Sequence, residues 1–93
     1  MLTKQEKFNL QAEVSAGSQI AMFMHDEKIQ SHFNGLLHGY QNLWVECENP
    51  AEREQLWYRA NAIKTLFESL QTVVNTGQMA AVQLAADKEQ EDQ

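Results

Sequence analysis

The chain has 93 residues and a formal net charge of −6, from thirteen Asp and Glu against seven Lys and Arg. The basic residues are scattered, so we expect no direct binding to nucleic acid or to an anionic membrane surface. The single cysteine, Cys47, excludes a disulfide within the chain, and no stretch approaches the ~20 apolar residues that cross a bilayer. A chain this short buries a modest core, which favours self-association or a larger partner.

Residues 1–24 are expected to form a helical arm. Thr3 and Glu6 have the spacing of a capping box, in which each side chain accepts a hydrogen bond from the other residue's backbone N–H. Gly17, with Ser15 and Ser18 beside it, is expected to interrupt the helix. The arm ends in an apolar cluster of Met22, Phe23 and Met24. Thioethers repack easily, so this cluster is either an adaptable binding surface or a cover for one end of the core.

A first long helix is predicted between Asp26 and Cys47. Asp26 can cap its start, and apolar residues then recur at alternating steps of four and three, which is typical of one face of an amphipathic helix. These residues are Ile29, Phe33, Leu36, Tyr40, Leu43 and Cys47.

A second long helix is predicted from Pro50 to Thr76. Asn49 is its expected cap, Pro50 suits its first position, and Gly77 is expected to end it in a left-handed conformation. The same rhythm of four and three appears at Leu56, Ala60, Ile63, Phe67, Leu70 and Val74.

Two such helices joined by about three residues are expected to fold back as an antiparallel hairpin over residues 26–76. The apolar positions then face each other as Leu43 with Leu56, Tyr40 with Ala60, Leu36 with Ile63, Phe33 with Phe67 and Ile29 with Leu70. After Gly77, residues 78–93 are expected to form a short helix and then an acidic, polar tail that is mobile unless an assembly holds it. The prediction is therefore a single small all-α domain over residues 1–93.

Gly35 and Gly39 lie inside the first of these helices, where each costs about 1 kcal/mol relative to alanine. Their spacing of four makes a smooth ridge that would let another backbone approach closely. The alternative is that both are tolerated on a solvated face.

Beside the shared apolar stripe, Leu37, Trp44 and Trp57 fall on one flank of the predicted hairpin. A core of two helices requires none of them, so this flank is expected to be an interaction surface. Either another chain docks on it, or residues 1–24 fold back over it. The predicted interface residues are thus Leu37, Trp44, Trp57, Gly35, Gly39, Met22 and Phe23.

No constellation of catalytic residues is apparent, so we expect no enzymatic activity, no cofactor and no metal site. The three histidines, at positions 25, 32 and 38, lack the i, i+4 spacing of a helical metal pair, and Cys47 belongs to the apolar stripe. The acids Glu46, Glu48, Glu52 and Glu54 gather at the predicted turn. Acidic residues at the start of a helix complement its dipole, and the calcium-binding spacing of an EF-hand is absent.

One stretch resembles a known group of proteins. The run NPAEREQLWYRANAIKTLFESLQTVVNTG, within residues 43–79, is similar to small helical proteins encoded in tailed-bacteriophage virion and packaging gene clusters. This resemblance implies a non-enzymatic virion or assembly component that binds itself or a larger phage or host protein. It would act in the host cytoplasm and could be incorporated into the virion. The alternative is a small acidic inhibitor or anti-defence protein that binds a host protein by charge mimicry.

Overall fold

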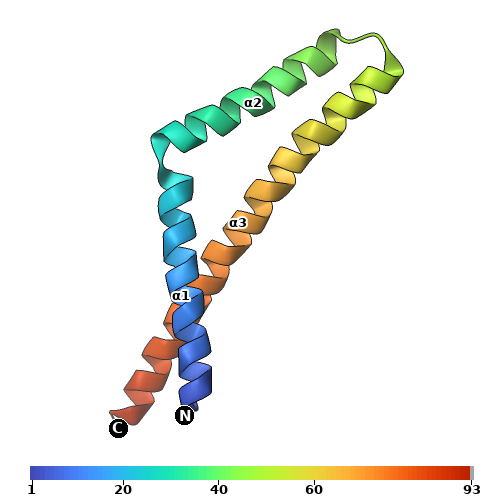
Figure 1. Ribbon diagram of the computed structural model, residues 1–93. Coiled ribbons are helices and arrows are strands. Elements are labelled where there is room, and N and C mark those ends of the chain that lie inside the picture. Colours follow the sequence, from blue (N-terminus) through green and yellow to red (C-terminus); the bar gives the residue numbers. More distant parts are fainter. Residues whose placement is uncertain (93) are drawn as a thin grey trace. The chain divides into compact units, whose positions relative to one another are not determined.

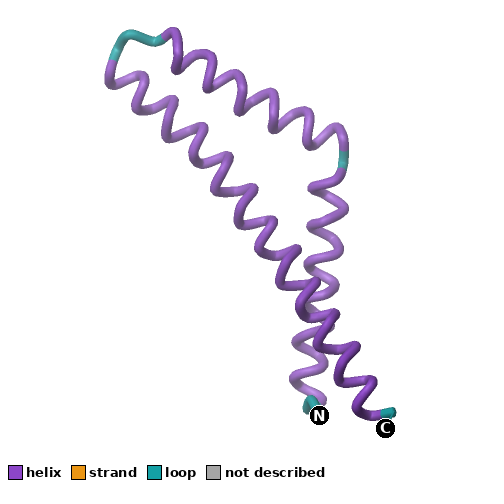
Figure 2. The backbone as a smooth tube through the Cα atoms, turned by 180° about the vertical axis from the view of Figure 1, so that it is seen from behind, coloured by secondary structure: helices purple, strands orange, loops and turns teal. Residues whose placement is uncertain are grey.

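The computed structural model describes residues 1–92, which form three α-helices joined by short loops (Figures 1 and 2). They are α1 (Lys4–His25), α2 (Glu27–Glu46) and α3 (Pro50–Glu91). The described residues contain no strand, so the predicted all-α class is confirmed. None of these helices has the length and apolar character that crossing a membrane requires.

Each helix begins at the cap that the sequence predicted. The Glu6 N–H donates to Thr3 Oγ1 at 3.1 Å and the Thr3 N–H donates to Glu6 Oε1 at 3.3 Å, which completes the capping box. Asp26 Oδ1 accepts from two backbone N–H groups of α2, at 2.9 and 3.0 Å. Asn49 Oδ1 does the same for α3, at 3.0 and 3.2 Å. These bonds satisfy N–H groups that a helix cannot pair internally.

Two predicted breaks are absent. The helix α1 runs without interruption through Gly17, and α3 continues through Gly77 to Glu91, so the expected stop and the short helix after it are wrong. No glycine in residues 1–92 has a positive φ, which means that Gly77 is an ordinary helical residue. The apolar stripe of α3 continues beyond Gly77 through Ala80 and Leu84. Ala80 is buried and Leu84 is partly covered, and this burial favours a helix that extends past Gly77.

The chain divides into two compact units. The terminal unit comprises residues 1–23 and 70–92, that is, most of α1 and the second half of α3. The middle unit comprises residues 24–69, that is, α2 and the first half of α3.

In the terminal unit, α1 crosses α3 at a pair of glycines (Figure 1). Both Gly17 and Gly77 are buried, and a Cβ added to Gly77 would lie 2.9 Å from the Glu13 carbonyl oxygen and 3.0 Å from Gly17 Cα. The two backbones therefore touch, which only residues without a Cβ allow. Val74 and Ala80 of α3 are buried on either side of this crossing.

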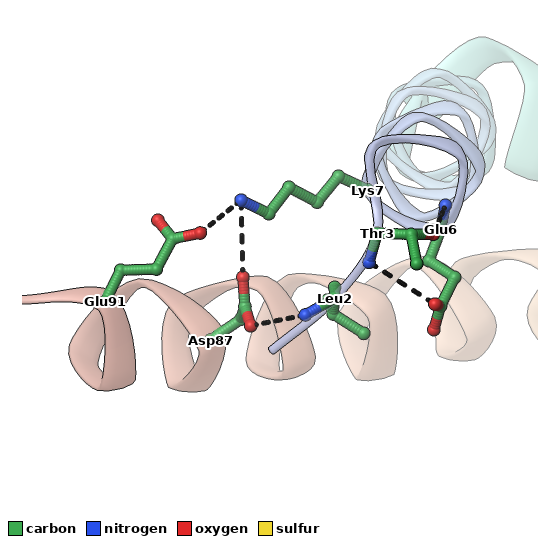
Figure 3. A network of polar contacts seen from close by, with 6 residues as sticks. All are labelled: Leu2, Thr3, Glu6, Lys7, Asp87 and Glu91. Carbon is green, nitrogen blue, oxygen red and sulfur yellow. Dashed lines mark hydrogen bonds and ion pairs between the residues drawn. The ribbon is translucent and has the colours of Figure 1, made fainter.

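The same unit contains a set of polar contacts that we call the Asp87 network, formed by Leu2, Lys7, Asp87 and Glu91 (Figure 3). The Leu2 N–H donates to Asp87 Oδ1 at 2.8 Å, and Lys7 Nζ lies 3.5 Å from Asp87 Oδ2 and also bonds Glu91. The Asp87 side chain is 6 % exposed.

These contacts correct the expectation of a mobile polar tail from residue 87 onward. Asp87 and Glu91 are helical and hold the start of the chain, while Gln93 lies outside the described residues. The Leu2 N–H, followed by the charge of Lys7, lowers the pKa of Asp87 below its usual value. The bond to Glu91 in turn raises the pKa of Lys7.

The middle unit holds its two helical segments together by side-chain contacts at both ends. The rings of Phe33 and Phe67 meet edge to face with centroids 5.1 Å apart, as the facing pairs predicted. Near the loop between the helices, the Arg53 guanidinium lies over the Trp44 ring, 4.1 Å from its centroid.

The orientation of α2 differs from the prediction. Leu36 and Leu43 were expected at the centre of the stripe, but they are 38 % and 56 % exposed, whereas Leu37 is partly covered. The other stripe residues, Ile29, Phe33, Tyr40 and Cys47, are partly covered, so the stripe is kept in part and α2 is turned toward the side of Leu37.

Candidate interaction surface

Aromatic side chains from α2 and α3 line a cavity of about 440 Å³ in the middle unit, and this cavity is open to solvent. We call it the aromatic groove and define it by Tyr40, Trp44, Leu56, Trp57 and Ala60. The two tryptophans come from different helices and line the same cavity, because each sits one step to the side of its helix's apolar stripe. Large aromatic residues that flank an open cavity are typical of protein interaction sites.

A second cavity, of about 300 Å³, lies beside α2 and α3 around Phe33, Leu37 and Phe67. Lys64 contributes to both cavities, so the two are neighbours along the same pair of helices. The predicted interface residue Leu37 lies in this second cavity, and it extends the apolar lining beyond the tryptophans.

Arg53 packs on Trp44, one of the residues that line the groove. Its guanidinium covers one face of Trp44, and its Nε atom is buried without a hydrogen-bond partner. The contact with the ring partly compensates the charge, since the face of an indole is electronegative. Arg53 was not among the predicted interface residues, and because its partner Trp44 lies on the other helix, no local spacing indicates the contact.

The middle unit lacks a sealed interior. None of residues 24–69 is buried, and Trp57 is 52 % exposed. The buried residues of the described chain, Gly17, Val74, Gly77, Ala80 and Asp87, all belong to the terminal unit. An apolar surface with so little cover is stabilised when something else removes it from water.

The remaining predicted interface residues lie elsewhere. Gly35 and Gly39 are exposed on α2, and a Cβ at either position would meet no atom within 4 Å. Met22 and Phe23 are exposed near the end of α1 and belong to the terminal unit. The predicted set is thus divided among the groove region, an open side of α2 and the terminal unit.

Residues 1–92 contain no group of three or more His, Cys, Asp and Glu side chains placed to hold a metal ion. Cys47 is a free, partly covered thiol that ends α2, where its backbone N–H donates to the Leu43 carbonyl oxygen.

Comparison of the chain with protein-family models, with curated proteins and with solved structures finds no match. The functional argument therefore rests on the chain's own surface.

Proposed function

We propose that the chain is a non-enzymatic accessory protein that acts through protein–protein contacts, and that the aromatic groove is the surface it presents to a larger partner. The observation that supports this most directly is the exposure of Trp44 and Trp57 on a unit in which no residue is buried. Tryptophan is enriched among the residues that dominate binding energy, and its burial by a partner would remove a large apolar area from water.

The scaffold for this surface, in our proposal, is an antiparallel hairpin of α2 and the first half of α3. Its support is the pair of contacts at opposite ends of the middle unit, Phe33 with Phe67 and Trp44 with Arg53. Such a hairpin places the two tryptophans side by side near its loop.

The resemblance of residues 43–79 to small helical bacteriophage proteins suggests a setting, namely a component of a virion or of its assembly. Charge mimicry of nucleic acid, the alternative, requires rows of free acids on one face. It has less support because Asp87 and Glu91 are bonded to Lys7 and Leu2 within the terminal unit.

The test is photo-crosslinking in the cell that expresses the protein, from a benzoylphenylalanine placed at position 57 or, as the matched control, at position 58. Tyr58 is an exposed aromatic neighbour that does not line the groove. We expect one defined adduct from position 57 and none from position 58. Equal crosslinking from both positions, or from neither, would contradict the proposal.

A second measurement separates a docking surface from a core. Trp57→Ala is expected to abolish the adduct formed from a crosslinker at position 44 while circular dichroism shows the helices retained. If this variant unfolds instead, the tryptophan belongs to the chain's own core and the groove is not a docking site.

A further inference from the structure

The aromatic groove and the second cavity repeat with a fixed spacing. Each of the six residues that line the second cavity lies seven residues from a residue that lines the groove. The pairs on α2 are Phe33 with Tyr40, Asn34 with Gln41 and Leu37 with Trp44, and those on α3 are Lys64 with Trp57, Phe67 with Ala60 and Glu68 with Asn61. Seven residues are two helical turns, or about 10 Å. We call the two cavities together the trough.

We propose that the trough takes one α-helix of the partner protein, which carries two apolar side chains seven residues apart and one acidic side chain between them. This inference rests on the proposed function, because it names the chemistry of the partner that occupies the aromatic groove.

The spacing of the two cavities selects a helix. Residues i and i+7 of an α-helix lie on one face about 10 Å apart, and helices that pack side by side place such residues into holes between the side chains of their neighbours. A strand repeats its side chains on one face about every 7 Å, so two of them cannot enter both cavities. A third helix would also cover α2 and α3 in a unit where no residue is buried.

Lys64 determines the charge that the partner helix needs. It is the only charged residue that lines the groove, it also lines the second cavity, and it is exposed. A partner residue three or four positions after the first apolar side chain lies between the two cavities, so an acid there would pair with Lys64. Glu68 lines the second cavity and disfavours a further acid beside the second apolar side chain.

The acidic character of the whole chain does not reverse this preference. The acids Glu46, Glu48, Glu52 and Glu54 gather near the loop that joins α2 to α3. Glu54 is the closest of them in sequence and precedes Lys64 by ten residues, which is about 15 Å along α3. Since charges are screened over about 8 Å at physiological ionic strength, Lys64 dominates between the cavities.

A second copy of the chain does not offer the required helix. Among the large apolar residues that are exposed in residues 1–92, two pairs are seven apart, Met1 with Phe8 and Leu36 with Leu43. The residues three and four positions after the first member are Lys4 and Gln5 in one pair and Gly39 and Tyr40 in the other. Neither pair has an acid between its members, and Lys4 would face Lys64. The partner is therefore another protein.

The first test is selection from a yeast-displayed library of helical peptides. Each peptide is an alanine- and glutamine-based helix of about 20 residues, long enough to be helical, with two positions seven apart and the third and fourth positions between them randomised. On the wild-type chain we expect apolar residues at both outer positions and Asp or Glu at one inner position. Trp57→Ala should abolish the binding of the selected peptides, which assigns them to the trough.

The second test reverses the charge of the trough. Selection on Lys64→Glu should replace the inner acid by Lys or Arg, and peptides selected on the wild type should bind this variant about threefold to tenfold more weakly. Arg59→Glu is the matched control, because Arg59 is an exposed cation of the same helix that lines neither cavity. It should leave the selected residues unchanged, and circular dichroism should show intact helices in both variants.

The proposal is overturned if no peptide is enriched, if the enriched peptides lack the apolar pair or still bind Trp57→Ala, or if the inner residue responds equally to Lys64→Glu and Arg59→Glu or to neither. A dimer of the wild type that Trp57→Ala dissociates would also overturn it, because a second copy would then fill the trough. If the crosslink from position 57 forms in the cell while the peptides fail, only the helical partner is contradicted. If that crosslink is absent, the proposed function fails as well.

Discussion

Replacing Gly77 with alanine should destabilise the terminal unit, although alanine is the better helix former. At an open helical position this change is expected to stabilise by about 1 kcal/mol. Here the new Cβ would lie 2.9 Å from the Glu13 carbonyl oxygen and 3.0 Å from Gly17 Cα, whereas ordinary contacts begin near 3.4 Å. The two helices would have to separate by about 0.5 Å, and overpacking of this kind costs about 1–3 kcal/mol. After the gain of about 1 kcal/mol is subtracted, we expect a net loss of up to about 2 kcal/mol.

The assay is urea unfolding followed by circular dichroism, at a protein concentration low enough to exclude self-association. Gly35→Ala is the matched control, because a Cβ there meets no atom within 4 Å and should stabilise by about 0.5–1 kcal/mol. The sign of the two changes should therefore be opposite. If Gly77→Ala stabilises the chain as much as Gly35→Ala does, the helices do not touch at Gly77 and the reasoning fails.

Three further changes address single contacts. Asp87→Asn should lower the thermal midpoint at neutral pH by weakening the bond from the Leu2 N–H. Because folding lowers the pKa of Asp87, the wild type's advantage should be complete above the unfolded-state pKa and vanish as the pH falls through the folded-state pKa, which melting curves over an acid series can measure. Asp26→Ala should cost about 1 kcal/mol and accelerate amide exchange in the first turn of α2, since two N–H groups lose their acceptor. Arg53→Met should cost about 0.5–1 kcal/mol in denaturant unfolding by removing the cation over Trp44.

The helix starts could be predicted from the sequence because capping is local. Thr3, Asp26 and Asn49 each accept hydrogen bonds from residues two or three positions further along. The residues next to a helix start are therefore enough to predict its cap. The same is true of Trp44 and Trp57, whose places on their helices follow from helical periodicity.

The end of the last helix could not be predicted in this way. Gly77 has the signature of a stop, but it lies against Gly17 of α1, where a residue without a Cβ is required for the close approach of the two helices. The signal that the stripe continued past the glycine was a seven-residue spacing, which relates Ile63, Leu70, Gly77 and Leu84. The sequence nevertheless predicted a helix end at Gly77, because glycine is usually costly inside a helix.

The helical structure of the polar end of the chain was not predicted, for a different reason. Composition alone makes residues 87–93 resemble a solvated tail, whereas Asp87 is buried by partners at the opposite end of the sequence, Leu2 and Lys7. Such pairing depends on tertiary packing and leaves no local pattern. The rotation of α2 that exposes Leu36 and Leu43 is likewise decided by packing, since both flanks of that helix are apolar enough to face a neighbour.

The Asp87 network also has a consequence for the order of folding. The bond from Leu2 to Asp87 joins residues 85 positions apart, whereas the contact of Phe33 with Phe67 closes a much shorter loop. Closing a long flexible loop has the larger entropic cost, and contacts between distant residues slow folding. The middle unit should therefore form first and shorten the loop that remains open. The terminal unit should close in the last and slowest kinetic phase.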